Sequence, residues 1–297
     1  MKKLMDRIGD GEILVCDGAM GTMLYTYGLK AGECPELWCV DRPNVVREIH
    51  RSYREAGSNI VKCNSFGGTR YRLRHFGLAD RAAELNRAAA ALSREVAGDT
   101  QYVVGSIGPT GEFMEPLGTE TSEAFYSAFQ EQAVALEEGG ADAVIVETMT
   151  GLEEASIAVR AAKENTRMVV MVSFTFDPQR NGSYATMMGV RPEQFAQTMS
   201  AMGVDVIGAN CGTGITHMVT IIKCLRTASV LPIISMPNAG MPVVENNKTV
   251  YKETPEEMAR AVPMLVKAGA QIVGGCCGTT PAHIAAMKNI LRSGKSE

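Results

Sequence analysis

The chain alternates between short apolar runs and longer segments in which apolar residues recur at helical spacing. Eight apolar runs follow one another, each ending in a turn rich in glycine or polar residues: 13–16, 59–63, 102–107, 143–146, 168–174, 206–211, 232–236 and 270–273. Because they are continuously apolar, these runs are typical of parallel strands covered on both faces. The segments between them are long enough for helical crossovers.

Helix signals support this alternation. Helical apolar spacing is found in three of the intervening segments: 44–56, 82–96 and 255–268. Thr150 and Thr254 each begin a capping-box sequence, with a glutamate three residues later. Four predicted helix-to-strand joints contain a glycine that can end the helix in the left-handed conformation: Gly57, Gly140, Gly203 and Gly269.

Eight βα units in 297 residues indicate one α/β domain, residues 1–297, folded as a single (β/α)8 TIM barrel. A doubly wound open sheet is the alternative. In a barrel, the carboxyl ends of all eight strands meet at one face, whereas an open sheet would spread them along an edge. The barrel therefore predicts that the polar residues and cysteines ending the runs converge: Asp17, Asn64, Glu147, Cys211, Asn238, Cys276 and Cys277.

Two adjacent cysteines follow the eighth run, in Gly274-Gly275-Cys276-Cys277-Gly278-Thr279-Thr280-Pro281. Glycines in this turn can bend the chain so that both sulfurs face one point, which a regular strand would prevent. Cys211 ends the sixth run in a similar glycine-flanked turn. Three thiolates with no fourth protein ligand suit Zn²⁺ with one open position, as in catalytic sites. The sequence therefore predicts a zinc site at the C-terminal face of the strands.

A plainer interpretation stays open for these cysteines. Cys211 can be a small core residue, and the adjacent pair can be a redox switch. The remaining cysteines are interpreted as structural: Cys16, Cys34, Cys39, Cys63 and Cys224. Eight cysteines in a chain of this length are not a disulfide framework, and clustered thiols in a reducing compartment favour metal binding or catalysis.

Composition narrows the classes of partner. The formal net charge is −4, and the lysines and arginines are scattered, which argues against nucleic acid and anionic membranes. No apolar run approaches the length of a membrane span, and the N-terminus lacks the apolar core of a signal peptide. These features favour a cytoplasmic protein and leave its oligomeric state open.

Three motifs of this chain resemble the signatures of the homocysteine S-methyltransferase family. They are Asp17-Gly18-Ala19-Met20-Gly21-Thr22, Gly208-Ala209-Asn210-Cys211-Gly212 and Gly274-Gly275-Cys276-Cys277-Gly278-Thr279. The resemblance covers nearly the whole chain. The segments 32–38 and 64–68 are more similar to the homocysteine-binding domain of cobalamin-dependent methionine synthase than to the betaine-using branch.

The resemblance implies that Cys211, Cys276 and Cys277 hold zinc and that the sulfur of L-homocysteine takes the fourth position. It also points to Asp17 and Glu147 as acceptors for the substrate ammonium group. The backbone of the turn at Gly18 and Ala19 is a candidate for the carboxylate, since such turns form anion-binding concavities. Three asparagines that end strands are expected to orient the ligand or support the cysteines: Asn64, Asn210 and Asn238.

The methyl donor is less defined than the acceptor. We find no Asp-x-His-x-x-Gly cobalamin motif in the sequence, so methylcobalamin carried by a separate corrinoid protein or domain is the expected donor. A small donor such as S-methylmethionine or a betaine, or a different thiol acceptor, remains an alternative. A non-catalytic zinc or redox thiol module is a third possibility.

Overall fold

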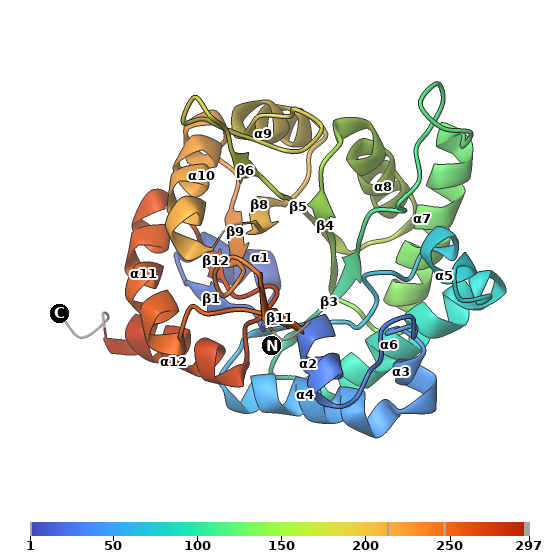
Figure 1. Ribbon diagram of the computed structural model, residues 1–297, viewed down its shortest axis with the longest axis horizontal. Helices are drawn as coiled ribbons and strands as arrows, with labels where there is room; N and C mark the ends of the chain where they lie inside the picture. The colour runs from blue at the N-terminus through green and yellow to red at the C-terminus, as the bar shows by residue number, and fades with distance from the viewer. Residues whose placement is uncertain (1, 213, 246–247, 294–297) are drawn as a thin grey trace.

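The computed structural model describes residues 2–212, 214–245 and 248–293. Eight parallel strands form its central sheet (Figure 1). Their bounds are β1 (Leu14–Val15), β2 (Ile60–Lys62), β3 (Tyr102–Ile107), β4 (Ala143–Met149), β5 (Val169–Phe174), β8 (Val206–Cys211), β9 (Ile233–Pro237) and β12 (Ile272–Val273). Each strand overlaps one of the eight apolar runs, so the strand predictions are confirmed.

The sheet closes into a barrel. Its strand order is β1-β12-β9-β8-β5-β4-β3-β2, with parallel pairing throughout. The two end strands meet through a parallel bridge between Cys16 and Ile60, and the Asp17 N–H donates to the Ile60 carbonyl at 3.0 Å. The predicted (β/α)8 architecture is therefore confirmed, and the open-sheet alternative is wrong.

Helices surround the strands as an outer ring (Figure 1). The helices before and within the first two crossovers are α1 (Leu4–Gly9), α2 (Gly21–Thr26), α3 (Trp38–Asp41), α4 (Pro43–Glu55), α5 (Arg70–Arg74), the 3₁₀ turn η1 (Ala79–Arg81) and α6 (Ala82–Ala97). Those that follow are α7 (Ser122–Glu138), α8 (Leu152–Asn165), α9 (Pro192–Ala201), α10 (Ile215–Ala228), α11 (Pro255–Ala268) and α12 (Pro281–Ser293).

The core has two layers. Between strands and helices, buried aliphatic and aromatic side chains such as Phe129, Phe174 and Ile222 form one continuous cluster. Inside the barrel, a second cluster contains Ile145, Met171 and their neighbours, together with Leu4 and Ile8 of α1. Helix α1 therefore closes the N-terminal end of a packed barrel, which leaves the opposite end for chemistry.

Local sequence signals account for most helix ends. The capping box at Thr254 is present at the start of α11. All four glycines predicted at helix-to-strand joints have positive φ, from 67° at Gly203 to 115° at Gly269. The capping box predicted at Thr150 is wrong, because α8 begins after Gly151 and has no side-chain cap. There the Thr150 carbonyl instead accepts a hydrogen bond from the Thr186 hydroxyl.

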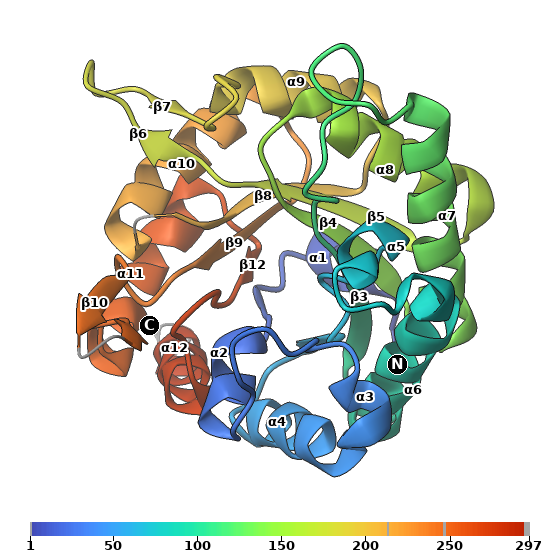
Figure 2. The same ribbon diagram turned by 45° about the vertical axis from the view of Figure 1, so that its right-hand side comes forward.

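Two hairpins stand outside the barrel sheet. One pairs β6 (Asp177–Pro178) with β7 (Tyr184–Ala185), and the other pairs β10 (Val243–Glu245) with β11 (Lys248–Val250). Figure 2 shows the first hairpin extending beyond the ring of helices. Among the described helices, none combines the length and apolarity needed to cross a bilayer. That residues 1–297 form one domain stays a prediction, since residues 1, 213, 246–247 and 294–297 lie outside the described part.

Candidate active site

A pocket of about 390 Å³ opens among residues at the carboxyl ends of the barrel strands. The residues predicted from sequence that line it are Ala19, Asn64, Glu147, Cys211, Cys276 and Cys277. Residues from β2, β3, β4 and β8 and from the turns after β1 and β12 thus share one cavity, although they are far apart in sequence. The predicted convergence at this face is what a closed barrel produces.

Three sulfur atoms lie together at this pocket. The Sγ atoms of Cys211, Cys276 and Cys277 are all within 4.8 Å of one another, and each residue is half-buried. Within the part of the chain that the structure describes, this is the one group of three histidine, cysteine or acidic side chains found close enough to share an ion. Three soft sulfur donors around one point fit a zinc ion. Three cysteines that served only as core residues would not be expected to bring their sulfur atoms so close together.

The backbone around the thiols is unusual in the way that functional sites often are. Cys211 has φ of 65°, and Thr148, which also lines the pocket, has φ of 62°. Left-handed backbone costs a non-glycine residue about 1–3 kcal/mol. In the other turn, a Cβ on Gly275 would collide with the Thr279 side chain, so that position requires glycine. These features aim the three sulfurs at one point.

Thr279 connects the turn after β1 to the turn after β12, a role that the sequence did not reveal. Its side chain is fully buried. The hydroxyl donates to the Cys276 carbonyl at 2.7 Å and accepts from the Ala19 N–H at 3.1 Å. Nearby, the Tyr53 hydroxyl donates to the Ala19 carbonyl at 2.8 Å. The two turns are thereby held in register around the thiols.

Replacing Thr279 with valine, which has nearly the same shape, is expected to lower the free energy of unfolding by about 1–3 kcal/mol. The reason is that the buried Ala19 N–H loses its described partner, while the Cys276 carbonyl loses the Thr279 hydroxyl and keeps only the Thr279 N–H at 3.2 Å. Urea denaturation followed by circular dichroism measures the change. The Thr198→Val variant in α9 is the control, since Thr198 is only half-buried, and equal stability of the two variants would contradict this role for Thr279.

The three thiols influence one another's protonation. Hydrogen bonds to Cys276 and Cys277 raise the pKa of Cys211 far above its ordinary value. Hydrogen bonds from Cys211 and Cys276 lower the pKa of Cys277 to about 3, with smaller contributions from Tyr251 and Lys62. The cluster therefore holds a thiolate at Cys277, and a thiolate is the form that binds a metal ion.

The three predicted asparagines have different surroundings. Asn210 accepts hydrogen bonds from the Thr148 N–H at 2.9 Å and the Ser173 hydroxyl at 2.6 Å. Its Nδ2 donates to Thr148 Oγ1 at 2.8 Å and to Cys276 Sγ at 3.7 Å, so Asn210 contacts a thiol and the strained strand end together. The Asn64 amide donates to the Pro35 carbonyl at 2.8 Å.

Asn238 lies beside the same cluster without lining the pocket. Its Nδ2 donates to the Gly212 carbonyl at 2.9 Å. Its Oδ1 is buried and has no hydrogen-bond partner among the described residues. Asn238 therefore anchors the turn after Cys211 and keeps one acceptor unused.

Glu147 shares its carboxylate with two residues that the sequence analysis did not select. Glu147 Oε2 forms an ion pair with Lys62 Nζ at 3.1 Å, and Oε1 accepts a hydrogen bond from the Ser106 hydroxyl. Burial alone would lower the pKa of Lys62, but the charges of Glu147 and its anionic neighbours raise it well above its ordinary value. The available signal for Lys62 was a lone charged residue inside the apolar run 59–63, whereas Glu147 was selected because it directly follows a run.

Asp17 lies beneath the pocket and does not line it. The Lys62 N–H donates to Asp17 Oδ2 at 2.8 Å, and the Cys16 thiol contacts Oδ1 at 3.4 Å. Burial raises the pKa of Asp17 to about 7, although Lys62 opposes this shift. The side chain is 2% exposed and already bonded, so Asp17 positions Lys62 in this structure.

In the turn predicted to bind the carboxylate, one backbone N–H already donates to a protein group. The Ala19 N–H is bonded to Thr279, and Gly18 packs so tightly that a Cβ there would lie 2.7 Å from Thr279 Oγ1. Ala19 lines the pocket, whereas Gly18 does not. The turn after Asp17 therefore offers fewer free donors than its sequence suggests.

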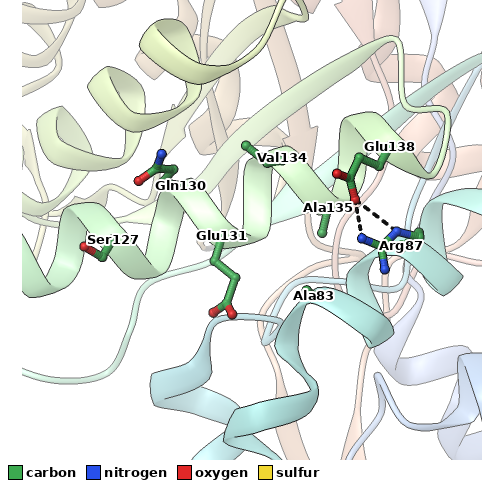
Figure 3. A pocket seen from close by; sticks show the side chains of 8 residues that line it. All are labelled: Ala83, Arg87, Ser127, Gln130, Glu131, Val134, Ala135 and Glu138. Carbon is green, nitrogen blue, oxygen red and sulfur yellow. Dashed lines mark hydrogen bonds and ion pairs between the residues drawn. The ribbon is translucent and has the colours of Figure 1, made fainter.

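A second hollow lies on the outside of the barrel, between α6 and α7 (Figure 3). Arg87 of α6 forms an ion pair with Glu138 of α7 across it. None of the residues predicted for the site lines this hollow, and no cysteine does. We therefore assign the chemistry to the thiol-lined pocket.

Comparison with known proteins gives matches over most of the chain. The sequence model of a family described as homocysteine S-methyltransferase matches residues 14–291. The chain is 35% identical to the methionine synthase of Mycobacterium tuberculosis, with 95% of this chain and 25% of that protein aligned. For the methionine synthase of Mycobacterium leprae the identity is 34%, with 92% and 24% aligned. The chain thus spans about a quarter of the length of these curated relatives.

Solved structures give a match of similar extent. The metallated form of the homocysteine methyltransferase MmuM from Escherichia coli superimposes with a TM-score of 0.79 at 25% identity, covering 96% of this chain and 98% of that one. The oxidized form of the same protein gives a TM-score of 0.80 with the same identity and coverage.

Proposed function

Because the chain belongs to the homocysteine S-methyltransferase family, we propose that its thiol-lined pocket catalyses methyl transfer to the sulfur of L-homocysteine, giving methionine. The observation that carries the proposal is the meeting of three cysteine sulfurs within 4.8 Å of one another. The same pocket contains the Glu147 carboxylate, so a sulfur-binding part and an amino-acid-binding part lie side by side.

Zinc fits the sulfur-binding part. Cys211, Cys276 and Cys277 would hold the ion, and Asn210 would support Cys276 through its amide. When bound, zinc lowers the pKa of a thiol that joins it and keeps that sulfur as the nucleophilic thiolate at neutral pH. The three protein thiols leave a position for such a ligand, as open catalytic zinc sites do. The metallated state of the Escherichia coli relative is in keeping with this assignment.

Other residues of the pocket would bind and orient the amino acid. Glu147 is the acceptor for the substrate ammonium group, and Ser106 holds one oxygen of that carboxylate in place. Asp17 contributes through Lys62, whose backbone N–H it binds. Asn64 and Asn238 fix the neighbouring turns through their amides. The substrate sulfur is thereby held in one orientation toward the incoming methyl group.

The proposed donor is methylcobalamin on a corrinoid protein or domain. Support comes from the similarity of residues 32–38 and 64–68 to the homocysteine-binding domain of cobalamin-dependent methionine synthases. We place this reaction in the cytoplasm, where thiols stay reduced.

Titration of the zinc-loaded protein with thiols tests the proposal. Calorimetry with L-homocysteine, L-cysteine and L-methionine is expected to give tight binding for homocysteine alone. Tighter binding of another thiol would move the reaction to a different acceptor. Metal analysis of the reduced protein separates catalysis from a redox module, because a redox module need not hold stoichiometric zinc.

Glu147→Gln is expected to weaken homocysteine binding by about 1–3 kcal/mol, the range for one hydrogen bond to a charged group. The amide keeps the shape of the carboxylate but removes the charge that attracts the ammonium group. Zinc content should stay the same, since Glu147 is not one of the three clustered thiol residues. Calorimetry on zinc-loaded wild-type and variant proteins gives the difference.

The control for this variant is a thiol without an ammonium group, 4-sulfanylbutanoate. Its affinity is expected to be equal in the two proteins or higher in the variant. If homocysteine binds both proteins with equal affinity, Glu147 has a role other than holding the ammonium group.

A further inference from the structure

We propose that Lys62 is the residue that binds the substrate carboxylate, so that Lys62 and Glu147 together clamp the zwitterionic head group of an α-amino acid. The inference rests on the proposed function, since it concerns how the same pocket holds homocysteine. It assigns a specificity-determining role to a residue that neither the sequence analysis nor the comparisons identified.

The side chain of Lys62 lies in the pocket, close to Glu147. It is the last residue of β2, at the strand end that faces the pocket, and its side chain is 11% exposed. Its backbone N–H is bonded to the buried Asp17 carboxylate, which fixes the start of the side chain. Nζ then reaches Glu147 Oε2 at 3.1 Å within the cavity that contains the three thiols. A buried ammonium group is costly unless it is paired, and Glu147 is its partner in this pocket.

The ammonium group of Lys62 can donate more hydrogen bonds than the described residues accept from it. A lysine ammonium group has three protons to donate and accepts none. One hydrogen bond of Nζ is found among the described residues, the one to Glu147. The remaining donor capacity lies beside a cavity of about 390 Å³, where an anionic oxygen can accept it.

The other candidates for the carboxylate are less suitable. The Ala19 N–H is bonded to Thr279, and the carboxyl side chains near this region are those of Asp17, Glu36 and Glu147, none of which attracts a carboxylate. Glu36 accepts from the Gly67 N–H at 2.7 Å and is contacted by the Cys34 thiol. A carboxylate entering the pocket would therefore be repelled by these groups and attracted by Lys62.

The geometry matches an α-amino acid head group. The ammonium and carboxylate of such a molecule are attached to the same carbon, so they lie close together, as Lys62 Nζ and Glu147 Oε2 do at 3.1 Å. An ammonium group bound to Glu147 would share that carboxylate with Lys62 and be repelled by it. A neighbouring carboxylate on the same ligand relieves this repulsion. The pair thus favours a zwitterion over a simple amine.

Three thiols and three proteins test the assignment. L-Homocysteine carries both charged groups, 3-aminopropane-1-thiol lacks the carboxylate, and 4-sulfanylbutanoate lacks the ammonium group. The dissociation constant of each is measured by calorimetry on zinc-loaded wild type, Lys62→Met and the double variant Lys62→Met/Glu147→Gln. The double variant removes both members of the Lys62–Glu147 ion pair, so it keeps the test valid if Lys62→Met alone is unstable.

Wild type is expected to prefer homocysteine over 3-aminopropane-1-thiol by about ten- to a hundredfold, the contribution of one charge-assisted hydrogen bond. Lys62→Met should reduce this preference to about twofold or less. It should also weaken the binding of 4-sulfanylbutanoate by about ten- to a hundredfold, because the same contact to the carboxylate is lost. Binding of 3-aminopropane-1-thiol should be unchanged or tighter, because Glu147 is released from Lys62. The exposed Lys223→Met variant in α10 is the control and should keep all three affinities.

Each contrary result has a defined meaning. If Lys62→Met and the double variant keep the wild-type preference for homocysteine, the carboxylate is held elsewhere and this assignment is wrong, while the proposed function stands. If the affinities for all three thiols fall by the same factor in both variants, Lys62 has only a structural role, and the assignment is also wrong. Failure of wild type to bind homocysteine at all would overturn the proposed function together with this inference.

Discussion

Cys277→Ser is expected to lower zinc affinity by more than about 100-fold, beyond the loss typical of residues that only support a ligand. Methionine formation should fall below detection. Serine keeps a hydroxyl proton at neutral pH, so it cannot replace the thiolate that the cluster stabilises at this position. Zinc content after dialysis, together with a methyl-transfer assay, measures both effects.

The fold should survive this substitution. Cys277 is half-buried in a turn above the strands, whereas the barrel interior is filled by other side chains. Far-ultraviolet circular dichroism is therefore expected to match wild type. Cys224→Ser provides the matched control, because Cys224 is also half-buried but lies in α10, outside the thiol cluster. If the Cys277→Ser protein keeps the zinc content and the turnover of wild type, the assignment of Cys277 as a metal ligand is wrong.

The barrel was predictable because the same pattern, an apolar strand followed by a helix, is repeated eight times along the chain. Strands buried on both faces must be continuously apolar, and each crossover needs a helix that ends before the next strand. Gly57, Gly140, Gly203 and Gly269 each mark such an end and each has positive φ. Eight repetitions of one local pattern make individual errors, such as the capping box at Thr150, harmless to the fold assignment.

The thiol cluster was predictable for a different reason. Adjacent cysteines between glycines are rare as core residues, and strand ends in a barrel converge on one face. These two features predicted that Cys211, Cys276 and Cys277 meet at one face, and the structure brings the three sulfurs together. Their role as zinc ligands stays a prediction until the metal is measured.

The electrostatic partners could not be read from the sequence. Lys62 occurs in an apolar run 85 positions before Glu147, and only the placement of β2 and β4 on the two sides of β3 brings the two charges together. The same is true of Thr279 and Ala19, which are 260 positions apart and meet where the turns after the paired strands β1 and β12 lie side by side. Long-range pairs of this kind depend on side-chain directions that hydrophobic periodicity does not specify.

Asp17 illustrates how a correct motif can suggest an incomplete role. Its position after the first strand made it a candidate for the substrate ammonium group. In the structure both of its carboxylate oxygens have protein partners, and its exposed fraction is 2%. Since Asp17 fixes the backbone of Lys62, its influence on the substrate can pass through Lys62. Whether it also contacts the substrate stays a prediction that the thiol titrations address.

The 297-residue chain is expected to form methionine from homocysteine with free methylcobalamin or a methylated corrinoid protein, and not with methyltetrahydrofolate alone. In the reaction, the homocysteine sulfur forms a bond to the methyl carbon while the cobalt–carbon bond breaks, leaving its electron pair on cobalt. The pocket holds the acceptor sulfur in place, and alignment of the two reactants is most of what remains to be catalysed. The assay follows methionine formation with each donor supplied separately.

The physical reason for the difference between donors lies in the size and contents of the pocket. Its volume of about 390 Å³ is lined by the three thiols and by charged groups suited to an amino acid, so it has room for homocysteine but not for a folate beside it. A corrinoid can present its methyl group from outside, whereas a folate would need a second cavity beside the thiols to bring its methyl group into line. Cys277→Ser should lose turnover with every donor, which separates catalysis from the slow uncatalysed reaction of thiols with methylcobalamin. Turnover with methyltetrahydrofolate and no corrinoid would overturn the assignment, and efficient turnover with S-methylmethionine or a betaine alone would move the chain to the cobalamin-independent branch.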